Sequence, residues 1–203
     1  MSTTRVQAAS QHADIAQEDS AALSRSAAGA QRNSVPRHTS KGPAKQTARR
    51  RKIVVRDSPI HGRGVYAARP IRAGERIIEY TGELISWKEA DRRPPSDPDD
   101  PQHTFFFALD DGKRVIDANV GGNSARWINH SCDPNCETEE TEAGRVYIDA
   151  LRNIRRGEEL HYDYCLIVEG KITKKLKRQY RCLCGAANCR GTMLAKRKKK
   201  KKH

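Results

Sequence analysis

Short alternating runs of apolar and polar residues, each closed by a turn signal, dominate the chain from residue 53 onward. Such alternation is typical of half-buried strands, because successive side chains point to opposite faces of a sheet. The predicted strands are 53–56, 64–68, 76–80, 105–109, 114–117 and 145–151. Asp110-Asp111-Gly112 predicts a hairpin turn, and 87–93 and 124–129 are the predicted short helices. We therefore expect a mostly β fold.

Aromatic residues mark the part of the chain that can form a hydrophobic core. All eleven lie between Tyr66 and Tyr180. Residues 1–52 contain none and are rich in Ala, Ser, Gln and Thr, so they cannot bury enough apolar surface to offset chain entropy. We predict that this arm is disordered. The lysine run near the C-terminus repels itself and is expected to be solvated.

Composition excludes a membrane protein, because no stretch approaches the roughly 18 to 20 apolar residues of a membrane span. The first residues also lack the basic start and apolar run of a secretory signal, so none is expected. The net charge of +14 is unevenly distributed. Residues 1–52 carry 10 basic and 3 acidic side chains, 166–203 carry 14 and 1, and 53–165 carry 15 and 21. Basic arms favour a polyanion, whereas an acidic body favours a basic ligand.

Four clusters carry residue types suited to chemistry. His61-Gly62-Arg63-Gly64 has two glycines that allow a ligand to approach the backbone closely, although an ordinary tight turn explains them equally well. The stretch 126–136 places Asn, His and Ser in succession, which is too polar for a core strand. Within 158–164, two tyrosines two residues apart project the same way from an extended chain, as two core rings would also do.

The fourth cluster is Cys182, Cys184 and Cys189. Thiolates at this spacing can hold one tetrahedral ion, with a fourth ligand from elsewhere. Six cysteines in a secreted chain would instead form disulfides. Because no secretory signal is recognised, zinc is favoured over disulfides.

In this order, the clusters resemble a SET-domain protein lysine methyltransferase, trithorax-like and with a post-SET zinc motif. The resemblance covers about residues 53–194 and rests on these stretches: His61-Gly62-Arg63-Gly64, Glu79-Tyr80-Thr81-Gly82-Glu83, 126–135, 159–164 and 182–189. It implies small β-sheets around a pseudoknot, in which the Asn-His-Ser and Tyr-Asp-Tyr segments are adjacent. It also implies a SET domain at 53–166 and a linker with a post-SET zinc segment at 167–194, which leaves the disordered basic arm at 1–52 and a basic tail at 195–203 as the parts predicted from composition.

The resemblance implies two ligand pockets that meet on opposite sides of a narrow channel. S-adenosylmethionine would be bound by His61, Gly62, Arg63, Gly64, Phe105, Arg126, Asn129, His130 and Leu183. The target lysine would enter between Tyr80, Phe105, Tyr162 and Tyr164. Tyr164 would orient the amine, with Tyr162 governing product multiplicity and Tyr80 completing the catalytic set. Structural zinc would be held by Cys182, Cys184 and Cys189, with Cys132 as the fourth ligand, and Cys136 and Cys165 would remain free thiols. Many relatives have Tyr where Phe105 stands, which puts the product in question, and Phe where Trp127 stands, which should only reshape the packing.

The implied activity is lysine methylation of a basic protein, with the histone H3 tail as first candidate and monomethylation, with some dimethylation, as the expected product. Alternatives are a non-histone basic substrate and an inactive adaptor that binds chromatin or nucleic acid. The basic arms would contact DNA, and Lys45 in Lys45-Gln46-Thr47-Ala48-Arg49, which is similar to the H3 tail, is a candidate automethylation site. The expected location is the nucleus or chromatin, including the nucleus of a host, and otherwise the cytoplasm.

Overall fold

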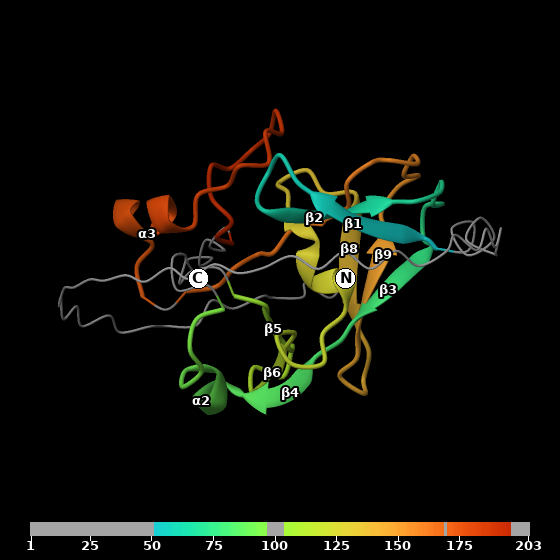
Figure 1. Ribbon diagram of the computed structural model, residues 1–203. Helices are drawn as coiled ribbons and strands as arrows, with labels where there is room; N and C mark the ends of the chain where they lie inside the picture. Colours follow the sequence, from blue (N-terminus) through green and yellow to red (C-terminus); the bar gives the residue numbers. More distant parts are fainter. Residues whose placement is uncertain (1–50, 97–103, 169, 196–203) are drawn as a thin grey trace, which may run out of the picture.

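A computed structural model describes residues 51–96, 104–168 and 170–195 (Figure 1). The elements in chain order are β1 Ile53–Asp57, β2 Arg63–Ala67, β3 Arg76–Tyr80, β4 Glu83–Ser86, α2 Trp87–Ala90, β5 Phe106–Ala108, β6 Arg114–Asp117, the 3-10 helix Ser124–Trp127, β7 Asn129–His130, β8 Cys136–Glu140, β9 Val146–Ala150, β10 His161–Tyr162 and α3 Lys174–Gln179. The expected mostly β fold is confirmed. The predicted arm at 1–52 and tail at 195–203, with Lys45, lie almost entirely outside the described residues.

The strands form small separate sheets rather than one large sheet. β1 pairs with β2, β9 lies between β3 and β8, and β6 lies between β4 and β5, with all of these pairs antiparallel. Figure 1 shows the β1–β2 hairpin above the β3–β9–β8 sheet, with the β4–β6–β5 sheet below. The predicted hairpin is present, and Asp111 accepts hydrogen bonds from the backbone N–H groups of Lys113 (2.8 Å) and Arg114 (3.0 Å) at its turn.

A short parallel pair brings two distant segments together. β7 pairs with β10, so that Asn129 lies opposite His161 and His130 lies opposite Tyr162. The expected adjacency of the Asn-His-Ser and Tyr-Asp-Tyr segments is therefore confirmed. Cys132 lies two residues after His130, and Tyr164 lies two residues after Tyr162. The β7–β10 pair therefore fixes both tyrosines and one cysteine of the predicted zinc site relative to each other.

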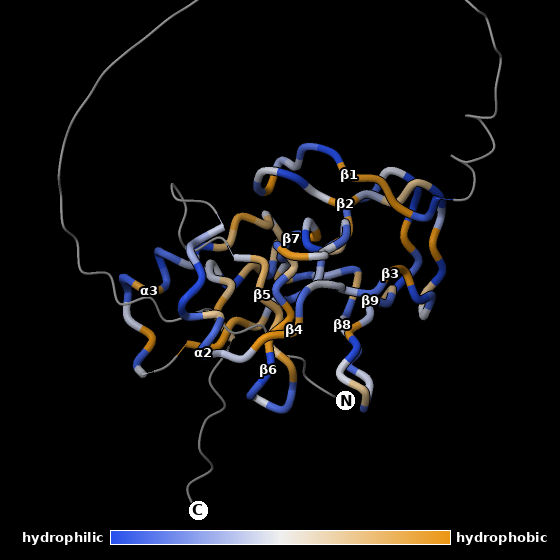
Figure 2. The backbone as a smooth tube through the Cα atoms, turned by 60° about the horizontal axis from the view of Figure 1, so that its bottom comes forward, coloured by the Kyte–Doolittle hydropathy of each residue, from blue (hydrophilic) through white to orange (hydrophobic). Residues whose placement is uncertain are grey.

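The main hydrophobic cluster lies where these sheets meet. Its fully buried members come from distant parts of the chain and include Val65, Phe107, Ile128, Ile148 and Leu160. In Figure 2 the hydrophobic stretches follow the strands, whereas the tube around α3 is mostly hydrophilic. Tyr80 and Tyr162 belong to this cluster, and Tyr164 packs against it. The predicted channel residues are thus anchored in the core.

Some elements differ from the sequence predictions. The helix expected at 87–93 ends at Ala90, with Ser86 as its N-cap, and the one expected at 124–129 is a single 3-10 turn whose following residues form β7. β4, β8 and α3 were not predicted. Three of the acidic residues of the body, Glu137, Glu139 and Glu140, lie in β8. Neither helix in the described ranges has the length and apolar character required to span a membrane.

Candidate active site and metal centre

One cavity of about 340 Å³ collects most of the predicted site residues. Its volume lies within the range of roughly 300–1,000 Å³ typical of small-molecule sites. Nine of the twelve predicted catalytic and cofactor residues line it: His61, Tyr80, Phe105, Arg126, Asn129, His130, Tyr162, Tyr164 and Leu183. A wider hollow of about 840 Å³ is lined by 70–72, 152–156 and Glu158, and it contains none of the predicted site residues.

The three predicted catalytic tyrosines all line the cavity. The hydroxyl of Tyr80 donates to the carbonyl of Phe105 (2.9 Å), and that of Tyr164 donates to the carbonyl of Ile128 (2.7 Å). The structure gives the Tyr162 hydroxyl no hydrogen-bond partner among the described residues, and its ring lies 4.9 Å from that of Tyr164. Burial raises the pKa of all three phenols above the usual value. They therefore remain protonated at neutral pH and cannot act as bases.

His130 is held at both ring nitrogens by the protein. The backbone N–H of Tyr164 donates to Nδ1 (3.1 Å), while Nε2 lies 3.5 Å from Sγ of Cys132. Burial lowers the pKa of His130 to about 4, against the opposing effect of the nearby Asp163 carboxylate. The imidazole is therefore neutral at pH 7 and connects the tyrosine segment to the cysteine cluster. With both nitrogens engaged, it is poorly placed for proton transfer.

A buried carboxylate, Glu159, organises the residues around Asn129, which lines the cavity. It accepts hydrogen bonds from the hydroxyls of Ser58 (2.8 Å) and Tyr66 (3.0 Å) and from Nδ2 of Asn129 (2.9 Å). The same Asn129 nitrogen also contacts the carbonyls of Arg63 (3.0 Å) and His61 (3.3 Å). Glu159 and Asn129 thus attach the 58–66 turn and strand to β7.

The remaining predicted cofactor residues, Gly62, Arg63 and Gly64, do not line the cavity. A Cβ at Gly64 would lie 2.2 Å from Oε1 of Glu159, so this glycine makes room for the buried carboxylate. The close approach expected at this turn is present, but its partner is a side chain of the protein. The Arg63 guanidinium stacks 5.0 Å from the ring of Trp127, which in turn meets the Phe105 ring edge-on at 4.8 Å.

Arg126 connects this stack to the cavity. Its guanidinium lies 5.5 Å from the Phe105 ring and 4.9 Å from the Trp127 ring, and it donates to the carbonyl of Ala118 (2.9 Å). Its Nε is buried and has no hydrogen-bond partner among the described residues. The cavity wall therefore offers a cationic group whose hydrogen-bonding capacity is incompletely used.

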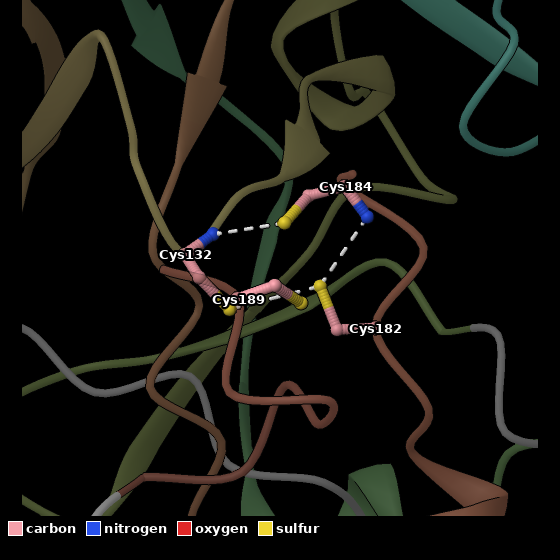
Figure 3. Close-up of side chains that lie close together, drawn as sticks. All are labelled: Cys132, Cys182, Cys184 and Cys189. Atoms are coloured by element: carbon pink, nitrogen blue, oxygen red, sulfur yellow. Dashed lines mark hydrogen bonds between the residues drawn. The ribbon is translucent and has the colours of Figure 1, made fainter. Parts of the chain in front are cut away.

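Four cysteines converge beside the cavity, as Figure 3 shows. The sulfur atoms of Cys132, Cys182, Cys184 and Cys189 all lie within 4.8 Å of one another, and those of Cys132 and Cys182 are 3.7 Å apart. Four sulfurs bound to one zinc ion at about 2.3 Å would be about 3.8 Å apart in a tetrahedron. These are the four residues that the sequence resemblance implies as zinc ligands, and their arrangement is compatible with a structural zinc site.

Backbone N–H groups surround these sulfurs. Those of Arg190, Cys184, Cys132 and Gly191 point to Sγ of Cys132, Cys182, Cys184 and Cys189 respectively, at 3.3 to 3.5 Å. Such donors stabilise negative charge on sulfur, as a metal-bound thiolate requires. Desolvation opposes ionisation of Cys184, but hydrogen bonds from the backbone N–H groups of Cys132 and Ala186 and from the neighbouring thiols lower its pKa to about 6, whereas burial raises the pKa of Cys132 and Cys182. Every sulfur of the cluster thus has a donor suited to thiolate ligation.

An ion pair links the cysteine cluster to the tyrosines. Both terminal nitrogens of Arg190 bind the carboxylate of Asp163, at 2.5 and 2.7 Å, and Asp163 lies between Tyr162 and Tyr164. The backbone N–H of the same arginine donates to Sγ of Cys132 (3.3 Å). The next residue after Asp163 and Tyr164, Cys165, has the only positive φ (45°) among non-glycine residues in the described ranges. The chain after Tyr164 is therefore turned sharply toward the cysteine segment.

The two cysteines outside the cluster remain thiols. Cys136 is buried in the core and Cys165 is half-buried. Burial raises the pKa of Cys136 to about 12 and that of Cys165 to about 11. Both are therefore poor nucleophiles at neutral pH.

Sequence reasoning did not find several residues of this site. Glu159 and Arg190 were not assigned a role, and the cavity also includes Tyr180, Arg181 and Met193 from the C-terminal segment. The one available signal was that Glu159 and Arg190 lie inside or beside motifs that the resemblance already used. Their burial depends on partners far away in the chain, which a local pattern does not reveal.

Comparison with known proteins identifies the domain. The family model for the SET domain matches residues 62–165. Similar curated proteins are "Histone-lysine N-methyltransferase trr" of Drosophila melanogaster (42% identical over 71% of this chain), "Histone-lysine N-methyltransferase 2B" of Homo sapiens (42% over 66%) and "Histone-lysine N-methyltransferase, H3 lysine-4 specific" of Eremothecium gossypii (40% over 71%).

The matches cover only a small part of those relatives, namely 6%, 5% and 15% of their respective lengths. Among solved structures, "ctPRC2 in an autoinhibited conformation bound to S-adenosylmethionine" matches 56% of this chain and 15% of that chain, with 33% identity and a TM-score of 0.49. This structural similarity is too low to support an inference about the chain.

Proposed function

Because the chain belongs to the SET-domain family and is similar to trithorax-type histone-lysine methyltransferases, we propose that it is an S-adenosylmethionine-dependent protein-lysine N-methyltransferase. One observation carries the proposal: three protonated tyrosines, His130 and Asn129 line a single cavity of suitable size. An inactive adaptor would not require this arrangement to be complete.

Methyl transfer to lysine requires that the protein hold the lysine amine in its neutral form. A free lysine has a pKa of about 10.4, so deprotonation at pH 7 costs roughly 4 to 5 kcal/mol. None of the described residues lining the cavity carries a carboxylate that would stabilise the ammonium form. When bound, S-adenosylmethionine supplies the methyl group on a positively charged sulfur, whose charge opposes protonation of a nearby amine. The cavity is thus suited to an uncharged nitrogen.

Tyr164 would orient that amine rather than deprotonate it. Its hydroxyl proton is donated to the carbonyl of Ile128 (2.7 Å), which leaves the phenol oxygen as an acceptor for an N–H of the amine. Alignment of two reactants removes much of the entropic barrier to an in-line transfer. Tyr80 is fixed in the same manner on the carbonyl of Phe105. The hydroxyl of Tyr162 has no partner among the described residues and would hold a water or the amine itself.

The residues present fit both groups that the family implies. Arg126, with its incompletely bonded guanidinium, would face acceptor oxygens such as those of a methionine carboxylate, while His61, Asn129 and Leu183 would line the remaining part of that pocket. Arg63, Gly62 and Gly64 would act through the turn that holds His61 in place. Zinc would be bound by Cys132, Cys182, Cys184 and Cys189 and would act structurally.

The substrate that the relatives' names favour is histone H3, and one relative is described as specific for H3 lysine 4. We propose an H3 tail as substrate and action at chromatin, with DNA contact through the basic arms. A Tyr at position 162 favours monomethylation, with some dimethylation, because its hydroxyl limits the room for a methylated amine. A non-histone basic protein is the alternative substrate.

Radiolabelled S-adenosylmethionine, core histones and an extract of the source cells test the proposal, with peptide mapping of any labelled protein. Label on an H3 lysine is expected, and Tyr164→Phe should reduce kcat by roughly 100-fold or more. Tyr147→Phe, on β9 and outside the cavity, is the matched control and should leave kcat unchanged. Label that persists in the Tyr164 variant would contradict the catalytic assignment, and absence of label in every fraction would favour the adaptor.

A further inference from the structure

The C-terminal segment next to the cavity carries charge of one sign only. Residues 170–195 contain no Asp or Glu. Arg190 is bound to Asp163, but the other basic side chains of this segment are exposed and form no ion pair among the described residues. We call them the basic rim: Lys171, Lys174, Lys175, Lys177, Arg178 and Arg181.

The basic rim lies at the edge of the candidate active site. Ile172 and Leu176 pack against the main core, so the lysines of α3 project away from the body. Gln179, the last residue of α3, and the following Tyr180 and Arg181 line the cavity. Figures 1 and 2 both show α3 at the end of the molecule opposite β3 and β9. Since the described cavity lining contains two arginines and no carboxylate, the lining itself is also positively charged.

This charge distribution disfavours binding of a free histone tail, which is the simplest form of the proposed substrate. A free histone tail is strongly basic, so the basic rim would repel it, contrary to the expectation that an acidic body attracts it. A polyanion would instead be attracted, and counterion release would make that attraction strongly dependent on salt. The only aromatic residue in 170–195 is Tyr180, which is buried and cannot stack on an unpaired base. Contact with the phosphate backbone of a duplex fits these properties best.

We propose that the basic rim docks on the phosphate backbone of double-stranded DNA and that the methyl-accepting lysine belongs to a protein bound to that DNA. The DNA contact cancels the repulsion and brings the basic tail of the bound protein to the cavity. The part concerning the substrate lysine rests on the proposed methyltransferase function, whereas the part concerning DNA contact does not.

Fluorescence anisotropy of a labelled duplex, measured with the full chain over a range of NaCl concentrations, tests the contact. The variant Lys174→Gln/Lys175→Gln/Lys177→Gln removes three charges of the basic rim. If all three contact phosphates, it should lower the slope of log K against log salt by about 2.7, at about 0.9 per contact. The matched control, Arg72→Gln/Arg155→Gln/Arg156→Gln, removes three exposed, unpaired charges from the distant hollow and should change the slope by less than about 1.

If the two triple variants changed the salt slope equally, net charge alone would explain the effect. That result would overturn the proposed docking surface. Tighter binding of polyglutamate than of duplex DNA, at equal charge concentration, would also overturn it and assign the surface to an acidic protein. Residues 1–50 and 196–203 are the same in both variants, so their contribution cancels in the comparison.

Turnover on an H3 peptide and on a nucleosome tests the second part. The wild-type chain should prefer the nucleosome in kcat/KM, and the lysine variant should reduce that preference by about tenfold while retaining its rate on the peptide within about twofold. An unchanged preference would overturn the inference about the substrate. Absence of turnover on both substrates, with the DNA slopes still different, would overturn the methyltransferase proposal and leave the docking surface supported.

Discussion

The two walls of the cavity are built in different ways. On one side, the chain completes its own network, because Glu159 bonds directly to Ser58, Tyr66 and Asn129. On the other side, the C-terminal segment has a six-residue helix, one bridge within itself (Arg181 to Thr192) and one bridge to the body (Leu166 to Leu194), and its centre is four converging thiols. The first wall is held by the chain's own hydrogen bonds. We expect the second wall to need a bound zinc ion.

Because of this difference, the stability of the fold and the completion of the site should depend on different residues. The carboxylate network lies within the main body and should fold with it as one cooperative unit. The cysteine wall supplies Tyr180, Leu183 and Met193 to the cavity, so it is needed for the site, although only Tyr180 and Leu194 of this segment are buried in the main hydrophobic cluster. Variants on the two sides should therefore produce different combinations of lost stability and lost activity.

Removal of the metal should have the largest effect. Cys184→Ser, or treatment of the wild type with a chelator, should abolish the bound zinc and reduce methyl transfer by roughly 100-fold or more, because structural zinc contributes about 10 to 16 kcal/mol to ordering its ligands. The far-UV signal of the strands should persist. Zinc content by mass spectrometry and circular dichroism measure both effects. Cys165→Ser, outside the cluster, should keep its zinc; full activity of the metal-free protein would show that the second wall does not need an ion.

Loss of the buried carboxylate should have the next largest effect. In contrast to metal removal, it should lower the stability of the fold and leave the zinc in place. Glu159→Ala leaves three donors without their acceptor and should lower the free energy of unfolding by about 3 kcal/mol, measured by urea denaturation. Its zinc content should be unchanged. Glu137→Gln, an exposed glutamate on β8, is the matched control, with a change below about 0.5 kcal/mol. A Glu159 variant that loses zinc but retains stability would contradict the assignment of stability to the Glu159 wall and of zinc dependence to the cysteine wall.

The ion pair between Arg190 and Asp163 should carry the coupling between the walls. Its two hydrogen bonds of 2.5 and 2.7 Å are partly buried, with side-chain exposures of 16% and 25%. A double-mutant cycle of Arg190→Ala and Asp163→Asn should give a coupling energy of about 1 to 2 kcal/mol in methyl transfer. Zinc affinity of Arg190→Ala should fall as well. Arg190→Lys should restore charge but only part of the effect, because lysine cannot form the bidentate pair.

Independent effects of the two substitutions would contradict this coupling. So would an Arg190→Ala variant with normal zinc affinity and normal turnover, since the arginine would then merely fill space between the walls.

The strands were predictable because their signal is local. β3 and β6 match the predicted bounds, and β1, β2, β5 and β9 differ by one residue at one or both ends. β8 was missed because four of its five residues are Glu or Thr, which indicates a loop. It pairs only with β9, at the edge of its sheet, where charged side chains are common and protect against unwanted pairing. α3 was missed because its charge concealed the N-cap Thr173 and the apolar pair Ile172 and Leu176.

The candidate site was predictable only as far as the family motifs extend. The tyrosines, Asn129, His130 and the four cysteines are positions that the SET resemblance identifies, and the structure brings them to the cavity or the cluster. Glu159 lies 101 residues from Ser58 in the chain, and Arg190 lies 27 from Asp163. A charged residue is buried only when such distant partners satisfy it, and no local pattern contains that information.

The smallest effect on stability should come from Tyr162→Phe, which alters the space between the walls and neither wall itself. Its hydroxyl has no partner among the described residues, so the free energy of unfolding should change by less than about 0.5 kcal/mol. The product should nevertheless shift from mono- and dimethyl-lysine toward trimethyl-lysine, because the cavity gains room for a methylated amine to rotate. Mass spectrometry of the methylated peptide measures the distribution. Unchanged products, with stability and zinc content also unchanged, would mean that the walls rather than the Tyr162 hydroxyl set the number of methyl groups transferred.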